Sequence, residues 1–188
     1  MTKMKKQRDN YTFLTHAPVH RVIVSMAVPT IISMLVTSIY GMVDTYYVGQ
    51  INTQSTAAVG ISFSIMTIIQ AIGFFFGHGS GNYISRMLGA KRTDEAKYMA
   101  ATGLVGSVAF GLAVAVVGLA FLSDICIFLG STETILPYTE RYLGIILVGA
   151  PFMTGAFTLN NQMRFQGNAK YAMYGILSGV VLNVVLAP

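Results

Sequence analysis

The 188-residue sequence has little charge: Asp, Glu, Lys and Arg make up 10% of it, whereas 54% of its residues are hydrophobic. Its mean hydropathy is +0.62. Soluble domains carry about 25% charged residues, because a solvated surface needs them. This shortage excludes an ordinary soluble domain, and it leaves lipid as the surroundings of most of the surface.

Other absences narrow the function. The one cysteine, Cys126, excludes an internal disulfide. No nucleophile–base pair or metal-ligand constellation is visible, so we expect neither an enzyme nor a cofactor. The glycine-rich segment 77–81 lacks both the strand–loop–helix context and the Lys-Ser/Thr ending of a phosphate-binding loop. Nothing in the sequence therefore indicates catalysis.

Long charge-free stretches dominate the chain. A bilayer-spanning helix needs about 20 mainly apolar residues. The predicted spans are residues 22–48, 57–85, 99–122, 142–162 and 171–188. The second stretch is long enough for more than one element. The sequence thus predicts an all-α membrane protein of about five helices, with short connections that make consecutive spans antiparallel neighbours.

The basic residues fall almost entirely on one side when these spans alternate. That side carries Lys3, Lys5, Lys6, Arg8, Arg21, Arg86, Lys91, Arg92, Lys97, Arg164 and Lys170. Arg141 alone lies on the other side, beside three acids. By the positive-inside rule we expect residues 1–18 to be cytoplasmic and the chain to cross the cell membrane several times. The net charge of +5 therefore does not indicate nucleic acid.

Residues that commonly begin or end helices lie near the predicted span ends. Gly49, Gly89 and Gly167 follow three of the spans, where a left-handed residue closes a helix. Thr93 is the predicted cap of the third span, with two acids in the following turn.

One charged side chain, Asp44, lies inside a predicted span, about a turn from the outer end of the first. An ionised carboxylate at mid-bilayer costs about 2.5–3.5 kcal/mol, and a helix C-terminus also disfavours negative charge. Both effects favour the proton-bound form. Asp44 belongs to a polar stripe with positions three and four residues apart: Thr30, Ser33, Thr37, Tyr40, Asp44 and Tyr47. Such a stripe should face a bundle interior or a water-filled cavity. The alternative is a hydrogen-bonded seam, with Asp44 reaching the outer interface.

The other polar residues inside spans admit plainer interpretations. Pro29 permits a bend in the first span, or it occupies a first helical turn. Glycines such as Gly77, Gly79, Gly81, Gly103, Gly106 and Gly111 favour close helix packing. Asn160, Asn161 and Gln162 favour interhelical hydrogen bonds over a site, and His78 favours a hydrogen-bonded histidine over a proton relay.

Several segments resemble one transporter family. These are Pro29 with Tyr40-Gly-Met-Val-Asp44-Thr45-Tyr-Tyr-Val48-Gly49, Asn82-Tyr-Ile-Ser-Arg86-Met-Leu-Gly89-Ala90-Lys91, Arg164-Phe-Gln-Gly167-Asn168-Ala-Lys170 and Leu182-Asn183-Val-Val-Leu-Ala187-Pro188. Together they resemble the first, second, fourth and fifth helices of multidrug and toxic compound extrusion (MATE) transporters of the bacterial multidrug exporter type.

The resemblance implies a twelve-helix antiporter with two six-helix lobes around a central cavity. A gradient of H⁺ or Na⁺ would drive out bulky, often cationic, drugs or dyes. By position, Asp44, Tyr40 and Asn183 map to the cation site of the N-terminal lobe. Ala187 replaces a frequent second carboxylate, which makes H⁺ the more expected coupling ion.

Residues 19–188 would then form an incomplete N-terminal lobe. The last span stops at Pro188 without a polar cap, so we expect a piece of a longer protein whose partner is the missing C-terminal lobe. Two alternatives stay open: a flippase for lipid-linked saccharides, which should have bases deep in its spans, and a non-transporting truncated membrane subunit.

Overall fold

The computed structural model describes residues 13 and 16–186, and it describes their side chains except at positions 44, 51 and 183–186. The principal helices are α2 (Val19–Ile51), α3 (Thr53–Gly89), α4 (Thr93–Ala120), α5 (Leu122–Phe128), α6 (Leu136–Phe165) and α7 (Ala169–Leu186). In the described part, α2, α3, α4 and α6 are long and apolar enough to cross a membrane, and α7 is a shorter apolar helix. The predicted all-α membrane fold is confirmed.

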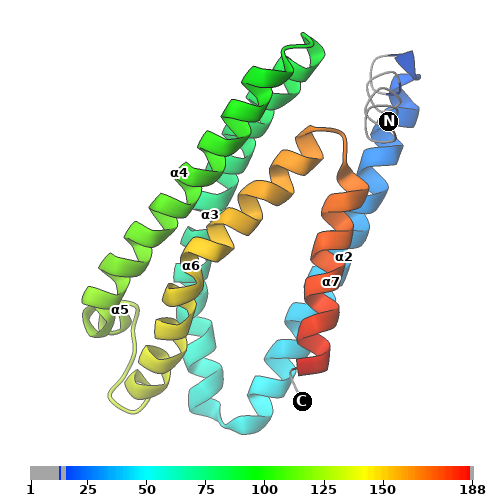
Figure 1. Cartoon of the computed structure of the whole chain (residues 1–188). Helices are drawn as coiled ribbons and strands as arrows, with labels where there is room; N and C mark the ends of the chain where they lie inside the picture. Colours follow the sequence, from blue (N-terminus) through cyan, green and yellow to red (C-terminus); the bar gives the residue numbers. More distant parts are fainter. Residues whose placement is uncertain (1–12, 14–15, 187–188) are drawn as a thin grey trace.

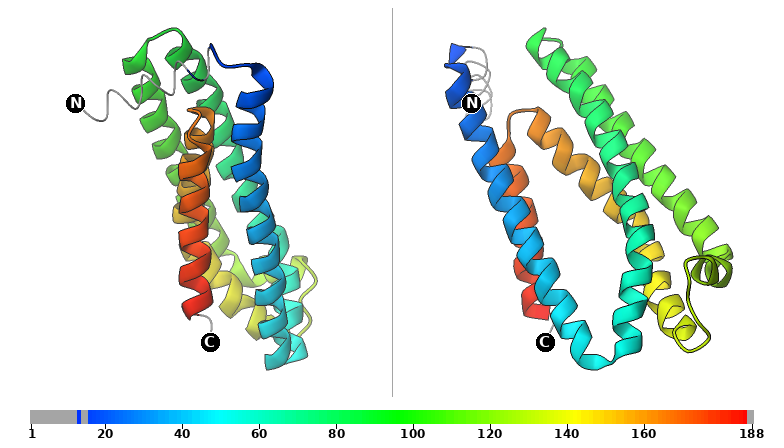
Figure 2. Two further views of the ribbon diagram at one scale, coloured as in Figure 1. Left: turned by 90° about the vertical axis from the view of Figure 1, so that its right-hand side faces the viewer. Right: turned by 180° about the vertical axis from the view of Figure 1, so that it is seen from behind.

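The helices form two groups (Figure 1). In one group, α3, α4 and α6 pack against one another, with the short α5 in the connection between α4 and α6. In the other, α2 and α7 lie side by side, and the right view of Figure 2 shows this pair apart from α3 and α4. The pair meets the first group through α2 with α3 and through α6 with α7, the elements that the chain itself joins.

One end of the bundle collects the start of α2, the α3–α4 turn and the α6–α7 turn (Figure 1). We call this the basic end. Of the eight Lys and Arg residues in the described part, seven belong to these three segments. The predicted alternation of the spans is therefore confirmed, and with it the separation of positive charge.

The second predicted span is a single helix. α3 has 37 residues, which corresponds to about 55 Å of helix and exceeds a bilayer of about 40–45 Å. Asn52 caps the N-terminus of α3, because its side chain accepts a hydrogen bond from Ser55 N at 2.6 Å. The charge-free stretch thus contains one long helix rather than two elements.

The predicted caps are partly wrong. Gly167 has φ 77° and ends α6 as predicted. Gly49, however, lies inside α2, because the helix continues to Ile51 before Asn52 caps α3. Gly89 is the last residue of α3, and Lys91 (φ 61°) takes the left-handed conformation instead. Thr93 is the first residue of α4 rather than its cap, since the chain has already turned at Lys91.

Small residues let α6 approach α3 and α4 closely. A Cβ added at Gly77 would lie 2.8 Å from Asn161 Cβ, and one added at Gly111 would lie 2.8 Å from Pro151 Cα. The same crowding holds at Gly73, Gly81, Gly103, Gly106 and Gly118. The predicted packing role is confirmed for these glycines of segments 77–81 and 103–111, but not for Gly79, which has no neighbour within 4 Å of an added Cβ.

Polar side chains of α6 form hydrogen bonds to α3 and α4. Thr154 Oγ1 donates to Ser107 O of α4 at 2.9 Å, and Thr158 Oγ1 donates to Gly73 O of α3 at 3.2 Å. Gln162 Nε2 donates to both helices, to Ser80 Oγ at 2.9 Å and Ala100 O at 3.2 Å. The interhelical role predicted for Gln162 is confirmed, whereas the Asn161 amide donates to its own helix, at Phe157 O.

Candidate functional site

The predicted site combines α2 with α7. These helices lie side by side and run in the same direction (Figure 1). Asp44 falls in the last third of α2, and Asn183 falls in the last third of α7. Their side chains, and the whole of Ala187, lie outside the described residues. The backbone therefore brings the two helices together, and the roles of Asp44 and Asn183 stay predictions.

The inner half of the α2 stripe is covered. Pro29 is buried, and the Ser33 side chain is 1% exposed and donates to Pro29 O at 2.8 Å. Thr30 is half-buried and donates to Met26 O at 2.9 Å. Pro29 is the eleventh residue of α2, so the alternative of a first-turn proline is wrong. An interior proline cannot donate to the carbonyl four residues earlier, which weakens the helix at this point.

The outer half of the stripe has a different environment. Thr37 is exposed and donates to Ser33 O at 2.8 Å, and Tyr40 is half-buried. Tyr47 is 51% exposed, with its ring edge-on to Tyr46 at a centroid distance of 6.0 Å. The described part of the stripe therefore has a more buried inner half and a more exposed outer half, and its role as the wall of a bundle interior or a water-filled cavity stays a prediction.

Helix geometry explains this division. The stripe advances 17 residues in five steps, a mean of 3.4 residues, while an α-helix has 3.6 residues per turn. Over the whole stripe this mismatch rotates the positions by about 100° around the helix axis. The ends of the stripe therefore face different directions around α2.

The Thr and Ser hydroxyls of the stripe can accept hydrogen bonds, but their protons are already donated. Thr30, Ser33 and Thr37 each give their proton to a carbonyl four residues earlier in α2. Their oxygen lone pairs stay available to a cation or a donor. Among the described residues, no group of three or more His, Cys, Asp and Glu is placed to hold a metal ion. His78 bonds Phe74 O at 2.9 Å, as the hydrogen-bonded interpretation expects.

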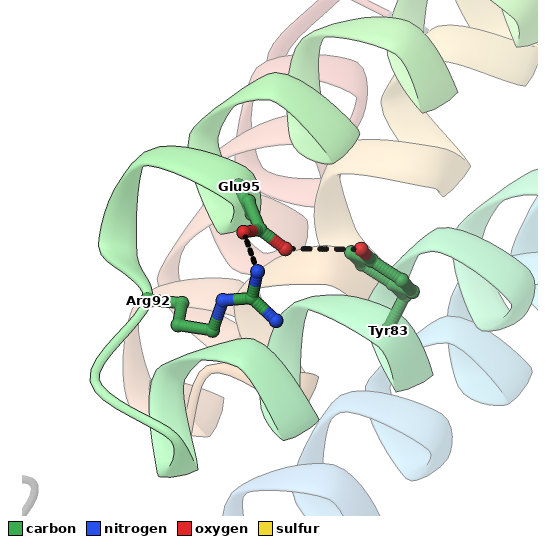
Figure 3. A network of polar contacts seen from close by, with 3 residues as sticks. All are labelled: Tyr83, Arg92 and Glu95. Carbon is green, nitrogen blue, oxygen red and sulfur yellow. Dashed lines mark hydrogen bonds and ion pairs between the residues drawn. The ribbon is translucent and has the colours of Figure 1, made fainter.

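A second polar cluster joins α3 to α4 at the basic end (Figure 3). Tyr83 OH donates to Glu95 Oε2 at 3.3 Å, and the other Glu95 oxygen pairs with Arg92. A hollow of about 350 Å³ lies beside it, lined by Tyr83, Asp94, Glu95, Tyr98 and Met99. Both of its carboxylates are already paired, since Asp94 Oδ1 accepts from Lys97 Nζ at 2.8 Å. Sequence reasoning missed this cluster, although the Arg92–Glu95 spacing of three residues signals an ion pair.

Known proteins resemble the chain over most of its length. A family model described as MatE matches residues 29–188. The multidrug export protein MepA of Staphylococcus aureus (strain MRSA252) is 35% identical over 132 residues, which is 70% of this chain and 29% of MepA. The chain therefore spans less than a third of the length of this relative.

Solved structures share the fold. A crystal structure of a proline-to-alanine mutant of MATE has a TM-score of 0.88 at 26% identity, covering 95% of this chain and 40% of that one. A crystal structure of MATE in the bent conformation has a TM-score of 0.82 at 27% identity, covering 90% of this chain and 38% of that one. The similarity includes α2, where the stripe lies.

Proposed function

The chain belongs to the MatE family, and from this premise we propose that it forms part of a secondary active multidrug efflux antiporter. The family and the matching structures are of transporters, so the chain is not an enzyme. The chain is a multi-pass membrane protein. Multidrug export is the function that MepA's name states, and we extend it to this chain as the proposal.

The proposal rests on one observation: the backbone hydrogen bonding of α2 is weakened around Pro29. Pro29 lies well inside the helix, and three hydroxyls within the next eight residues bond back to the helix carbonyls. Hydrogen bonds from Ser and Thr side chains to the carbonyl four residues earlier often bend helices. Proline in addition removes one backbone hydrogen bond of the helix. A MATE structure in a bent conformation supports a role for such a bend.

We place the coupling step at Asp44. The carboxyl group takes a proton from the outside and becomes neutral, and α2 then bends near Pro29 and displaces the substrate outward. Release of the proton inward resets the cycle, with Tyr40 and Asn183 as the neighbouring polar groups. A proton moved through 100 mV supplies about 2.3 kcal/mol, enough to shift the balance between two conformations.

The coupling ion, the orientation and the partners follow from the residues. Asp44 would be the one acid of the site, because Ala187 stands where the family often has a second carboxylate. This favours H⁺ over Na⁺, since Na⁺ prefers several oxygen ligands. The concentration of bases at one end supports a cytoplasmic N-terminus as part of the proposal. The substrates are cationic drugs or dyes, and the partner is a C-terminal lobe that completes the central cavity.

The test joins the chain in frame to the C-terminal half of a MepA-type relative and measures ethidium efflux from cells. Asp44→Asn should reduce efflux at least tenfold, because the side chain can no longer gain a proton. Asp124→Asn is the matched control, since it removes an exposed acid outside the spans, and it should leave efflux unchanged. Gradient-dependent efflux that survives Asp44→Asn undiminished contradicts the proposal.

A further inference from the structure

Arg164 ends α6 with a guanidinium group that is held in place. Its Nε donates to Asn160 Oδ1 at 3.0 Å, and the Asn160 amide donates to Ala172 O of α7 at 3.0 Å. The side chain is half-buried. Asn160 thus fixes Arg164 at the α6–α7 corner through Nε alone. The two terminal amino groups of a guanidinium can donate four further hydrogen bonds.

Arg164 has no acidic partner in the part of the chain that the structure describes. The basic end has seven basic residues there and two acids, Asp94 and Glu95. Both acids are committed, to Lys97 and to Arg92. A charge that is partly removed from water without a counter-charge is costly, so the site favours an anion from outside the chain.

An apolar stripe on α6 leads up to this corner. Exposed residues recur every three or four positions along one face: Ile145, Val148, Phe152, Ala156, Leu159 and Met163. The stripe covers about 27 Å of helix, close to the thickness of a hydrocarbon core. Phe152 is 80% exposed and Ile145 is 71% exposed. The stripe borders the Asn160–Arg164 face, because those residues directly follow Leu159 and Met163 on the helix.

We propose that Arg164 binds the phosphate of a phospholipid in the leaflet at the basic end, with an acyl chain along the α6 stripe. A guanidinium matches phosphate oxygens with two parallel hydrogen bonds, which makes arginine well suited to this group. Free phosphate offers the same oxygens, but it does not use the apolar stripe. The inference concerns lipid and is independent of the proposed transport.

Native mass spectrometry of the purified chain tests this proposal. Dioleoylphosphatidylglycerol should stay bound, whereas dioleoylglycerol, which lacks the phosphate, should not. Arg164→Gln should weaken lipid retention about tenfold, the effect of losing a charged hydrogen bond. Arg86→Gln removes an exposed arginine at the same end and should retain lipid as the wild type does. Equal retention by the two variants, or competition by millimolar inorganic phosphate that displaces the lipid, overturns the proposal.

A second measurement needs no variant, so it holds even if Arg164→Gln fails to fold. A phosphatidylglycerol with a photoreactive diazirine in its headgroup is irradiated with the wild-type chain in nanodiscs. Peptides that contain residues 160–172 should carry most of the label. Label spread evenly over the basic end, or concentrated at the α3–α4 turn, contradicts a site at Arg164.

Discussion

The glycines of the two helix groups differ in what surrounds them. In α3 and α4, an added Cβ at Gly73, Gly103 or Gly118 would come within 2.7 Å of another helix. In α2 and α7, an added Cβ at Gly41 or Gly179 meets nothing within 4 Å. The first group is interlocked by contacts that allow little movement, and the second pair has room to change shape.

Hydrogen bonding follows the same division. Thr154, Thr158 and Gln162 of α6 bond to neighbouring helices. In contrast, Thr30, Ser33 and Thr37 of the α2 stripe bond within α2. In the most apolar window of each helix, 33% of α6 is buried against 11% of α2. The comparison teaches that α3, α4 and α6 are the tightly connected helices of the described part, and that α2 is the least enclosed of the long helices.

The largest loss of stability is expected when a glycine in a crowded helix contact is replaced by alanine. Gly111→Ala places a methyl group against Thr154 and the backbone of Pro151, so α4 and α6 must separate. We expect a loss of about 1–3 kcal/mol in stability, measured as a lower thermal midpoint in detergent. Gly179→Ala in α7 is the matched control and should be neutral or slightly stabilising. Equal destabilisation by both variants would remove the distinction between the two groups.

A smaller loss of stability is expected when the hydrogen bonds that Gln162 makes to α3 and α4 are removed. Gln162→Leu removes the hydrogen bonds to Ser80 Oγ and to Ala100 O, and with them the side-chain link from α6 to α3 and α4. The expected loss is about 1–2 kcal/mol in the same thermal assay. Gln50→Leu at the exposed end of α2 should change the midpoint little. An unchanged midpoint for Gln162→Leu would mean that these bonds do not hold the first group together.

The smallest loss of stability is expected when the hydroxyl group of Thr158 is removed. Thr158→Val keeps the shape of the side chain but removes its bond to Gly73 O of α3. Bonds between membrane helices contribute about 0.6 kcal/mol on average, which is the expected loss. Thr102→Val loses a bond within its own helix at an exposed position, so it should lose less. A larger loss at Thr102 would reverse the comparison.

The fold was predictable from composition because lipid selects long apolar segments and charge selects their orientation. Helix ends were less predictable. Gly49 lies inside α2 because Asn52 caps the next helix, and Lys91 makes the left-handed turn assigned to Gly89. These outcomes depend on neighbours that a local pattern does not contain.

The site was predictable in part. The pairing of α2 with α7, which the positions of Asp44 and Asn183 imply, agrees with the structure. The direction that each stripe residue faces was harder to predict, because the 3.4-residue spacing winds around the helix. The four-residue spacing of Asn160 and Arg164 indicates that the two side chains are neighbours on one helix face. The bond from Asn160 to Ala172 O of α7 depends on tertiary packing, which no local pattern contains.

The central claim is that α2 moves against a fixed α3–α4–α6 group when Asp44 gains a proton. Spin labels on Tyr46→Cys with Val105→Cys, and on Ile145→Cys with Val105→Cys, report the two motions by electron paramagnetic resonance in nanodiscs, with Cys126→Ser in both. Lowering the pH from 8 to 5 should shift the Tyr46–Val105 distance and leave Ile145–Val105 unchanged, and Asp44→Asn should abolish the pH response. A Tyr46–Val105 distance that does not change with pH, or an Ile145–Val105 distance that changes equally, would contradict this account.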